Sequence, residues 1–340
     1  MASLIQLRGN TASYWTANNP VLAARELVIE TDTMRYKIGD GATAWNALSY
    51  IELTGTFNSI TLNDDVDPTA AGADSLIMFA RFIAGRAYPA YVGPSGQGTV
   101  LQPFMARNKI GYWCPPGNAT TVPGVLGYTA PTSVGSVGRS VTTSNMFTRM
   151  RRLGYQSAAT AGALASTRVA VAQITCGDSG IGGYTKIIRF GISDPVVVTG
   201  ARFFVGVSAT VSAATNVEPD TWLNSIGVGT RSTDTNLQLF ASGSTKQAPI
   251  NLGSNFPGNT SNTDVYELAL FAPATSGNVY WQVTRINTGD IAAGVISNGG
   301  GVTAPSSTSL LSYLQAWRSN NTTAAAVAFD VMSDYIETDQ

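Results

Sequence analysis

Short runs of β-branched and aromatic residues, separated by turn-forming residues, constrain the fold of this chain more than any other feature. Val196-Val197-Val198 and Phe203-Phe204-Val205 are two such runs, and Gly, Pro, Asn and Asp recur between runs of this kind. Strands favour β-branched and aromatic side chains, whereas amphipathic helices need apolar residues three and four positions apart. The pattern therefore predicts an all-β protein.

The charge content limits the partners of the chain. Charged residues make up 12% of the 340 residues, and the formal net charge is −1 without any block of like charge. Nucleic-acid binding needs clustered basic side chains, so we expect no nucleic-acid partner. No apolar run approaches the ~20 residues of a membrane span, and residues 1–8 lack an apolar signal core. We therefore expect no membrane insertion, and synthesis and assembly in a cytoplasm.

Histidine is absent, which removes several classes of enzyme at once. Ser-His-Asp and Cys-His pairs, His-based zinc sites and two-His iron sites all need it. Cys114 and Cys176 are the two cysteines, too few for a disulfide framework, and we expect both to be buried free thiols. Asp64, Asp65 and Asp67 lack the twelve-residue calcium-loop pattern and indicate a solvated turn. The sequence thus predicts no metal and no cofactor.

Residues 5–50 contain the signals of a very small domain. The pattern predicts a short strand, a brief helix capped by Thr11, and a second strand that ends at Glu30. Arg35-Tyr36-Lys37-Ile38 alternates polar and apolar residues, as a half-buried strand does, and Gly39-Asp40-Gly41 is typical of a tight turn. Trp45 and Leu48 are candidates for its core.

This segment resembles the N-terminal module of phage tail fibres and major-tropism-determinant-like proteins. The resemblance is carried by Ile5-Gln6-Leu7-Arg8, Trp15-Thr16-Ala17-Asn18-Asn19-Pro20-Val21-Leu22, Glu30-Thr31-Asp32-Thr33, Arg35-Tyr36-Lys37-Ile38-Gly39-Asp40-Gly41 and Thr43-Ala44-Trp45. This chain departs from the usual family pattern at three places: Gly9-Asn10, Arg25 and Met34. These differences affect the geometry of local turns. The resemblance implies a small intertwined homotrimeric module over residues 1–52, which attaches or caps a fibre and has no catalytic residues.

A trimer also follows from the size of the module. A domain of about fifty residues buries too little surface to be comfortably stable alone, and association supplies further burial. We expect the trimer interface to include Trp15, Ile38 or Trp45.

The rest of the chain divides into a connector and a larger domain. Residues 53–145 give weak signals, with a short helix or strand over 75–84, and we interpret them as a β-rich connector. Residues 146–340 contain regularly spaced strand patterns that suit a jelly-roll-like β-sandwich, and they resemble sandwich domains that end many phage fibre proteins. The predicted strands cover 169–173, 186–192, 201–209, 225–229, 237–241, 265–271, 279–286, 292–296, 311–317 and 324–335; residues 310–317 also fit helical spacing.

Several aromatic and amide side chains are candidates for glycan binding. Aromatic faces cover the apolar faces of sugars, while amides and hydroxyls meet the sugar hydroxyls. Alternation over 279–284 places Trp281 in the core and Tyr280 on the surface. Trp222 lies in a turn-rich stretch where it can be exposed, and Phe256 and Asn259 lie in a second loop of this kind.

These observations predict a structural virion protein rather than an enzyme: a homotrimeric phage tail fibre or receptor-binding subunit. Its partners are other tail or baseplate proteins and a host-surface carbohydrate, and it is assembled in the host cytoplasm. A head fibre or capsid decoration protein is one alternative. A polysaccharide depolymerase is another, and it needs two carboxylates about 5–9 Å apart. The pairs to inspect for that chemistry are Glu218 with Asp220 and Asp264 with Glu267.

Overall fold

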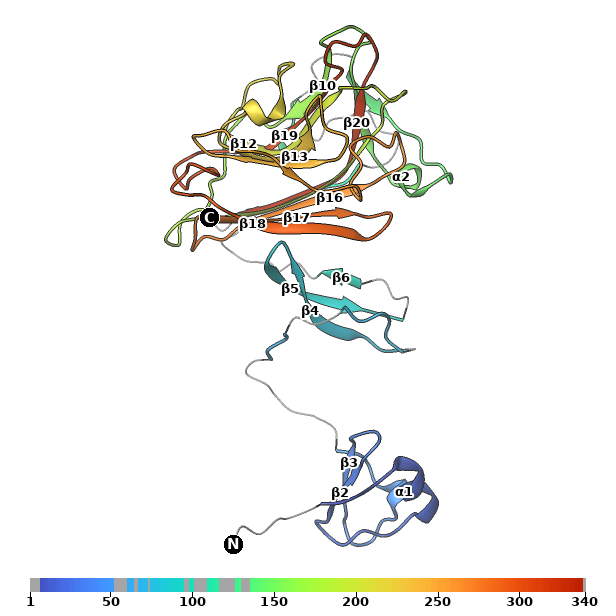
Figure 1. Cartoon of the computed structure of the whole chain (residues 1–340). Helices are drawn as coiled ribbons and strands as arrows, with labels where there is room; N and C mark the ends of the chain where they lie inside the picture. The colour runs from blue at the N-terminus through green and yellow to red at the C-terminus, as the bar shows by residue number, and fades with distance from the viewer. Residues whose placement is uncertain are drawn as a thin grey trace. The chain divides into compact units, whose positions relative to one another are not determined.

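The computed structural model of the chain describes residues 7–51, 60–63, 67–72, 74–94, 98–100, 109–115, 126–129 and 135–338. The chain folds into two compact units, residues Met1–Thr61 and Leu62–Gln340. Figure 1 follows the chain from the N-terminus in blue to the C-terminus in red; strands dominate the second unit, and the first combines three short strands with one helix and a 3-10 turn. The predicted all-β class is therefore confirmed. Asp64 and Asp65 lie outside the described residues, while Asp67 forms an ion pair of 2.8 Å with Arg81.

The first unit is a three-stranded sheet with one short helix. Its elements are β1 (Arg8–Asn10), α1 (Ala12–Asn18), β2 (Leu27–Glu30), β3 (Tyr36–Ile38) and a 3-10 turn, η1 (Trp45–Ala47). Thr11 caps α1 as predicted, since its side chain accepts a hydrogen bond from the Tyr14 backbone N–H. The sheet order is β1-β2-β3. Trp15 and Trp45 stack at 5.0 Å and, with Leu22 and Val28, form the core of this unit.

Strand β3 is oriented opposite to the expectation from its alternation. Lys37 is buried, whereas Tyr36 and Ile38 are 37% and 50% exposed. The Lys37 Nζ donates to the Trp45 carbonyl at 2.7 Å and lies 4.7 Å from the centre of the Trp45 ring. A second ring, that of Tyr50, has its centre 4.2 Å from the Lys37 Nζ. Lys37 therefore lies on the core side of the sheet, and the apolar residues of β3 face outwards.

The second unit begins with a small antiparallel sheet. It consists of β4 (Ile77–Ile83), β5 (Arg86–Val92) and β6 (Gly98–Val100). The segment 75–84, for which the sequence allows a helix or a strand, is therefore mainly strand. Ala84 and Gly85 join β4 to β5 with positive φ values of 49° and 71°, as a two-residue hairpin turn of type I′ requires.

Two large antiparallel sheets form the sandwich of the second unit, stacked face to face in Figure 1. The six-stranded sheet has the order β10-β19-β12-β13-β14-β15, with β10 (Leu164–Arg168), β12 (Arg202–Ser208), β13 (Ser225–Thr230), β14 (Gln238–Ser242), β15 (Ile250–Asn251) and β19 (Ser312–Ser319). The eight-stranded sheet has the order β18-β17-β16-β11-β20-β9-β8, and β7 also pairs with β20. Its strands are β7 (Lys109–Trp113), β8 (Gly135–Gly138), β9 (Leu153–Gln156), β11 (Tyr184–Ile192), β16 (Tyr266–Ala272), β17 (Asn278–Arg285), β18 (Asp290–Ser297) and β20 (Ala328–Thr338).

The sandwich core lies between these sheets. Phe203 of the six-stranded sheet packs against Phe190 and Phe329 of the eight-stranded sheet, with ring centres 5.4 and 5.8 Å apart. Strands that are distant in sequence, such as β11 and β20, are antiparallel neighbours, as the predicted jelly-roll-like arrangement requires.

Most of the predicted strands are present, and residues 169–173 are the exception. Residues 310–317, which also fit helical spacing, contain most of strand β19. Residues 169–173 do not form a strand, because the local strand β10 covers Leu164–Arg168 and ends before them. Strands β7 and β8, from the stretch interpreted as a connector, pair with β20 and β9 of the sandwich. A short helix, α2 (Met146–Arg149), precedes β9, and Asn145 and Thr148 form its capping box.

Candidate functional site

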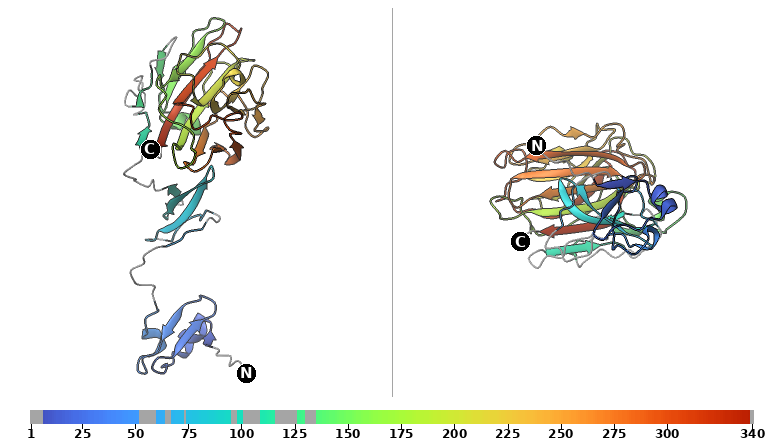
Figure 2. Two further views of the ribbon diagram at one scale, coloured as in Figure 1. Left: turned by 90° about the vertical axis from the view of Figure 1, so that its left-hand side faces the viewer. Right: turned by 90° about the horizontal axis from the view of Figure 1, so that it is seen from below.

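The outer face of the eight-stranded sheet gathers aromatic, amide and charged side chains. Residues directly opposite each other on antiparallel strands share a face, so the register defines this surface. One row contains Gln282, Ala269, Ile187, Tyr335 and Tyr112, and the next contains Thr284, Glu267, Arg189 and Ser333. We call these two rows the outer face. Figure 2 shows the strands of this sheet side by side in the view from below.

The alternation of strand β17 explains why this surface is polar and aromatic. Val279, Trp281 and Val283 are buried in the sandwich, while Tyr280, Gln282 and Thr284 are half-buried on the other side. The predicted division of this strand into a core side and a surface side is therefore confirmed. Tyr280 stacks on Phe271 of β16, with ring centres 6.1 Å apart and planes inclined by 28°.

The β4–β5 hairpin covers the edge of the outer face nearest Tyr280. A Cβ on Gly85 would lie 2.7 Å from the Tyr280 ring, so only glycine permits this close approach. The Ala84 backbone N–H donates to the Gln282 side-chain oxygen at 3.4 Å. Arg86 makes a bidentate pair with buried Glu337, with N–O distances of 3.0 and 3.1 Å. Tyr280 is thus part of the contact between hairpin and sheet.

Away from the hairpin, the outer face presents hydrogen-bonding groups beside an exposed aromatic ring. Arg189 and Glu267 form an ion pair across β11 and β16, and their side chains are 41% and 14% exposed. Thr284 accepts a hydrogen bond from the Gln282 amide at 3.2 Å. Tyr112 is 64% exposed on β7. An exposed ring on the same sheet face as a guanidinium, a carboxylate and hydroxyls matches the chemistry of a surface that binds sugars.

Tyr335 adds a second aromatic hydroxyl to the outer face. It lies opposite Tyr112 in the register and donates a hydrogen bond of 2.9 Å to Glu337. Burial and this bond raise the pKa of Tyr335 far above its ordinary value, so the hydroxyl stays protonated. Sequence reasoning singled out Tyr280 for glycan binding and Glu267 only for hydrolysis, and it missed Tyr112, Arg189 and Tyr335, because the outer face spans five strands and only the register brings its residues together.

Trp222 and Phe256 are buried, in contrast to the exposure that their turn-rich surroundings predict. Trp222 is 8% exposed and packs on Phe204 and Trp317 at 5.5 and 5.6 Å between ring centres. Phe256 is 3% exposed and belongs to the sandwich core. Asn259 is half-buried, and its amide donates to Asp194 at 2.9 Å. None of these three side chains lies on the outer face. The two rings point inwards from their loops, and Asn259 is held by Asp194.

The three candidates for the trimer interface differ in exposure: two are buried and one is exposed. Trp15 and Trp45 are both 1% exposed within a single copy of the first unit, so they fill its own core. Ile38 is the exposed member. It lies opposite Leu27, and Tyr36 lies opposite half-buried Ile29. We call these four residues the apolar sheet face.

The acidic pairs suggested for hydrolysis are already engaged by basic side chains. Glu218 binds Arg202 at 2.9 Å and Asp264 binds Arg285 at 2.9 Å. Asp220 lies 3.0 Å from Lys246. Burial raises the pKa of Glu218, but hydrogen bonds from Ser232 and Arg202 outweigh it and lower the pKa overall. The general acid of a glycosidase needs a raised pKa, whereas the pKa of Glu218 is lowered.

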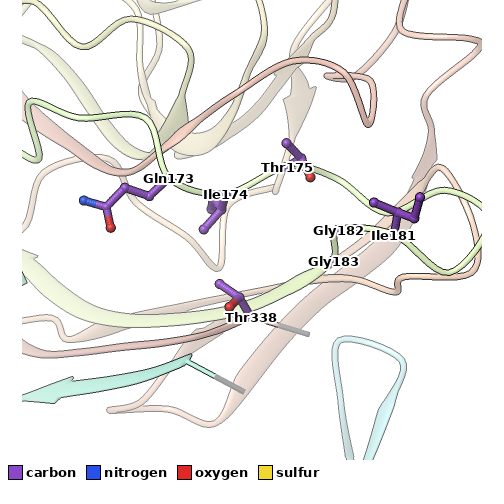
Figure 3. A pocket seen from close by; sticks show the side chains of 7 residues that line it. All are labelled: Gln173, Ile174, Thr175, Ile181, Gly182, Gly183 and Thr338. Atoms are coloured by element: carbon purple, nitrogen blue, oxygen red, sulfur yellow. The ribbon is translucent and has the colours of Figure 1, made fainter. Parts of the chain in front are cut away.

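A separate small pocket opens at the end of β20 (Figure 3). Its volume is about 140 Å³, and it is lined by Gln173, Ile174, Thr175, Ile181, Gly182, Gly183 and Thr338. Sites for small molecules usually occupy ~300–1,000 Å³, so this pocket fits at most one small group of a ligand.

Within the described ranges, no three His, Cys, Asp or Glu side chains gather as metal ligands. The same residues contain no helix long and apolar enough to cross a membrane. Both cysteines are free thiols: Cys176 is buried, whereas Cys114 is half-buried instead of fully buried as expected.

Comparison with known families identifies the N-terminal segment. Residues 5–43 match the family model described as the major tropism determinant N-terminal domain. This family is one of phage tail-fibre and receptor-binding proteins, so the resemblance seen in the sequence is confirmed. No curated protein sequence matches the chain significantly.

Solved structures with related sandwiches are distant in sequence. Peanut lectin in complex with a nine-residue peptide is 8% identical, with a TM-score of 0.43, and the match covers 68% of this chain and 98% of the lectin. Lectin UEA-II complexed with galactose is 12% identical at a TM-score of 0.43, covering 68% and 98%. The CBM2 module of an evolved Dit protein from Lactobacillus casei BL23 phage J-1 is 12% identical at 0.36, covering 69% and 91%. All three TM-scores lie below 0.5.

Proposed function

We propose that this protein is a homotrimeric receptor-binding subunit of a phage tail fibre, and that the outer face of its sandwich binds a host-surface glycan. The match of residues 5–43 to a phage tropism family supports the place in the virion. The first unit joins the chain to other tail or baseplate proteins, and the sandwich contacts the host.

The observation that carries the glycan site is the composition of the outer face. Tyr112 offers an exposed ring, and Arg189, Glu267 and Thr284 offer donors and acceptors on neighbouring strands. A regular sheet holds these groups rigidly, which reduces the entropy lost on binding. Each site alone binds weakly, and three sites on one trimer multiply into avidity.

The apolar sheet face supports trimerisation. In the first unit the core side of the sheet carries Val28 and Lys37, whereas Ile38, Tyr36, Leu27 and Ile29 line the opposite side. Apolar side chains exposed on one side of a sheet, as Ile38 and Tyr36 are here, are typical of an interface with another chain. In a trimer, a second and a third copy of the same module cover the apolar sheet face, because a closed symmetric oligomer buries the same face of every copy.

Binding is tested with fluorescently labelled full-length protein on an array of purified bacterial surface polysaccharides. We expect some glycans to retain the protein without any release of oligosaccharide. Released oligosaccharide would favour a depolymerase instead. Absence of binding across the array, with a trimer confirmed by light scattering, would favour a head fibre or decoration protein.

A further inference from the structure

Lys186 and Asp334 form a fully buried pair between the two central strands of the eight-stranded sheet. Both side chains are 0% exposed, and the Lys186 Nζ donates to Asp334 Oδ1. Lys186 lies opposite Ile336, and Asp334 lies opposite Ile188. The two residues are therefore diagonal neighbours on the inner side of the sheet, within reach of a long side chain.

The surroundings of this pair are aromatic and dry. The Tyr128 hydroxyl donates to the other carboxylate oxygen, Oδ2. The ring of Tyr313, from the opposite sheet, has its centre 5.2 Å from the Lys186 Nζ. Tyr155 of strand β9 is also fully buried in this core. All of these side chains are buried, so the amine and the carboxyl group meet away from bulk water.

The pair differs from the other buried ion pairs of the sandwich. Among the described residues, the other carboxylates that are 0% exposed, Asp194, Asp330 and Glu337, are paired with arginines. A guanidinium stays protonated and is a very weak nucleophile. Lysine is chemically different, because its amine becomes nucleophilic when it loses a proton. Among the lysine side chains that the structure describes, Lys186 is the one in a salt bridge with a carboxylate that is 0% exposed.

Burial favours the uncharged form of the Lys186 amine. Taking an ammonium out of water costs several kcal/mol. Burial lowers the pKa of Lys186, which favours the neutral, nucleophilic amine. A neutral amine held against a carboxylic acid is the combination that condenses to an amide.

We propose that Lys186 and Asp334 join in an intramolecular isopeptide bond. The Nζ attacks the Asp334 Cγ, so that an Nζ–Cγ bond forms and the Cγ–Oδ2 bond breaks. The departing oxygen takes one proton from the carboxylic acid and one from the amine and leaves as water. No oxidant or reductant takes part. The Tyr128 hydroxyl, which donates to Oδ2, holds the leaving oxygen and polarises the carboxyl group.

Fixed geometry supplies the driving force for this condensation. Groups held together in a fold can reach effective concentrations of about 10⁵–10⁸ M, which offsets the disadvantage of amide formation in water. The dry core also slows the reverse hydrolysis. The product ties β11 to β20, the two strands that carry Arg189 and Tyr335 of the outer face, so the bond resists separation of these strands under load.

The mass of the intact, denatured full-length protein tests the bond. We expect a mass lower than that of the sequence by one water molecule. After trypsin digestion, residues 169–189 should appear joined to residues 319–340, without cleavage at Lys186. A full mass, or a free peptide cut after Lys186, would overturn the proposal. Neither readout depends on glycan binding or on the trimer.

An Asp334→Asn variant assigns the reacting group. An asparagine can condense with lysine only by releasing ammonia. The mass of the variant should therefore either be lower than that of its sequence by one ammonia molecule or equal the full mass. Loss of water from this variant would place the reaction elsewhere and contradict the proposal. Lys186→Arg, which retains the positive charge, should show its full mass, and a missing water there would contradict the proposal as well.

Discussion

Replacement of Ile38 by aspartate should dissociate the trimer without unfolding the first unit. Ile38 is 50% exposed in a single copy, and its full burial is worth about 1.5–3 kcal/mol, so covering the exposed half contributes about 1 kcal/mol per copy. Three copies give about 3 kcal/mol, which corresponds to roughly a hundredfold in the dissociation constant. The buried carboxylate adds its desolvation cost, so this value is a lower bound.

The assay for Ile38→Asp is light scattering across a dilution series, with near-ultraviolet circular dichroism of the Trp15–Trp45 stack as the folding control. Met34→Asp is the matched variant, because Met34 is 62% exposed and lies in the turn that precedes β3, outside the apolar sheet face. We expect a monomer for Ile38→Asp and a trimer for Met34→Asp. An Ile38→Asp protein that remains trimeric at every dilution would refute the placement of the interface.

Three further predictions follow from burial and hydrogen bonding. Trp45→Ala should unfold the first unit, because loss of a large buried aromatic costs about 3–5 kcal/mol and the unit is small; limited proteolysis should cut it while the sandwich resists. Burial raises the pKa of the Cys176 thiol to about 12, so native protein should react with a thiol reagent at Cys114 alone, and two labels before denaturation would contradict its burial. Because the pKa of Glu218 is lowered, its stabilising effect is present above the ordinary carboxyl pKa and is lost as the pH falls. The difference in urea midpoint between wild type and Glu218→Gln should therefore become smaller from about pH 7 to about pH 3. A difference that stays constant over this range would contradict the lowered pKa.

The periodicity of the sequence predicts what depends on local pattern. Alternation over 279–284 separates Trp281 from Tyr280 correctly, and Thr11 caps the first helix as its residue type suggests. Local pattern misleads where tertiary packing decides. Lys37 is buried because the Trp45 and Tyr50 rings and the Trp45 carbonyl surround its amine, and no spacing within the strand reveals this.

Long-range pairing explains why most of the candidate site was not visible in the sequence. Tyr112 and Tyr335 meet only because β7 adds to the edge of β20. Trp222 is drawn into a cluster on the far side of the six-stranded sheet by Phe204 and Trp317, whose positions depend on two other strands. Lys186 and Asp334 are likewise brought together by the register of β11 and β20.

The central claim, that the outer face binds a host glycan, is tested most directly by substitutions in that face. A Tyr112→Ala, Arg189→Ala double variant removes the exposed ring and the guanidinium. Val197→Ala, at a site that is 65% exposed between β11 and β12, is the control. On a polysaccharide that retains the wild-type trimer, we expect the double variant to lose retention and Val197→Ala to keep it. Retention of the double variant at the wild-type level, with both variants trimeric and folded, would contradict the claim.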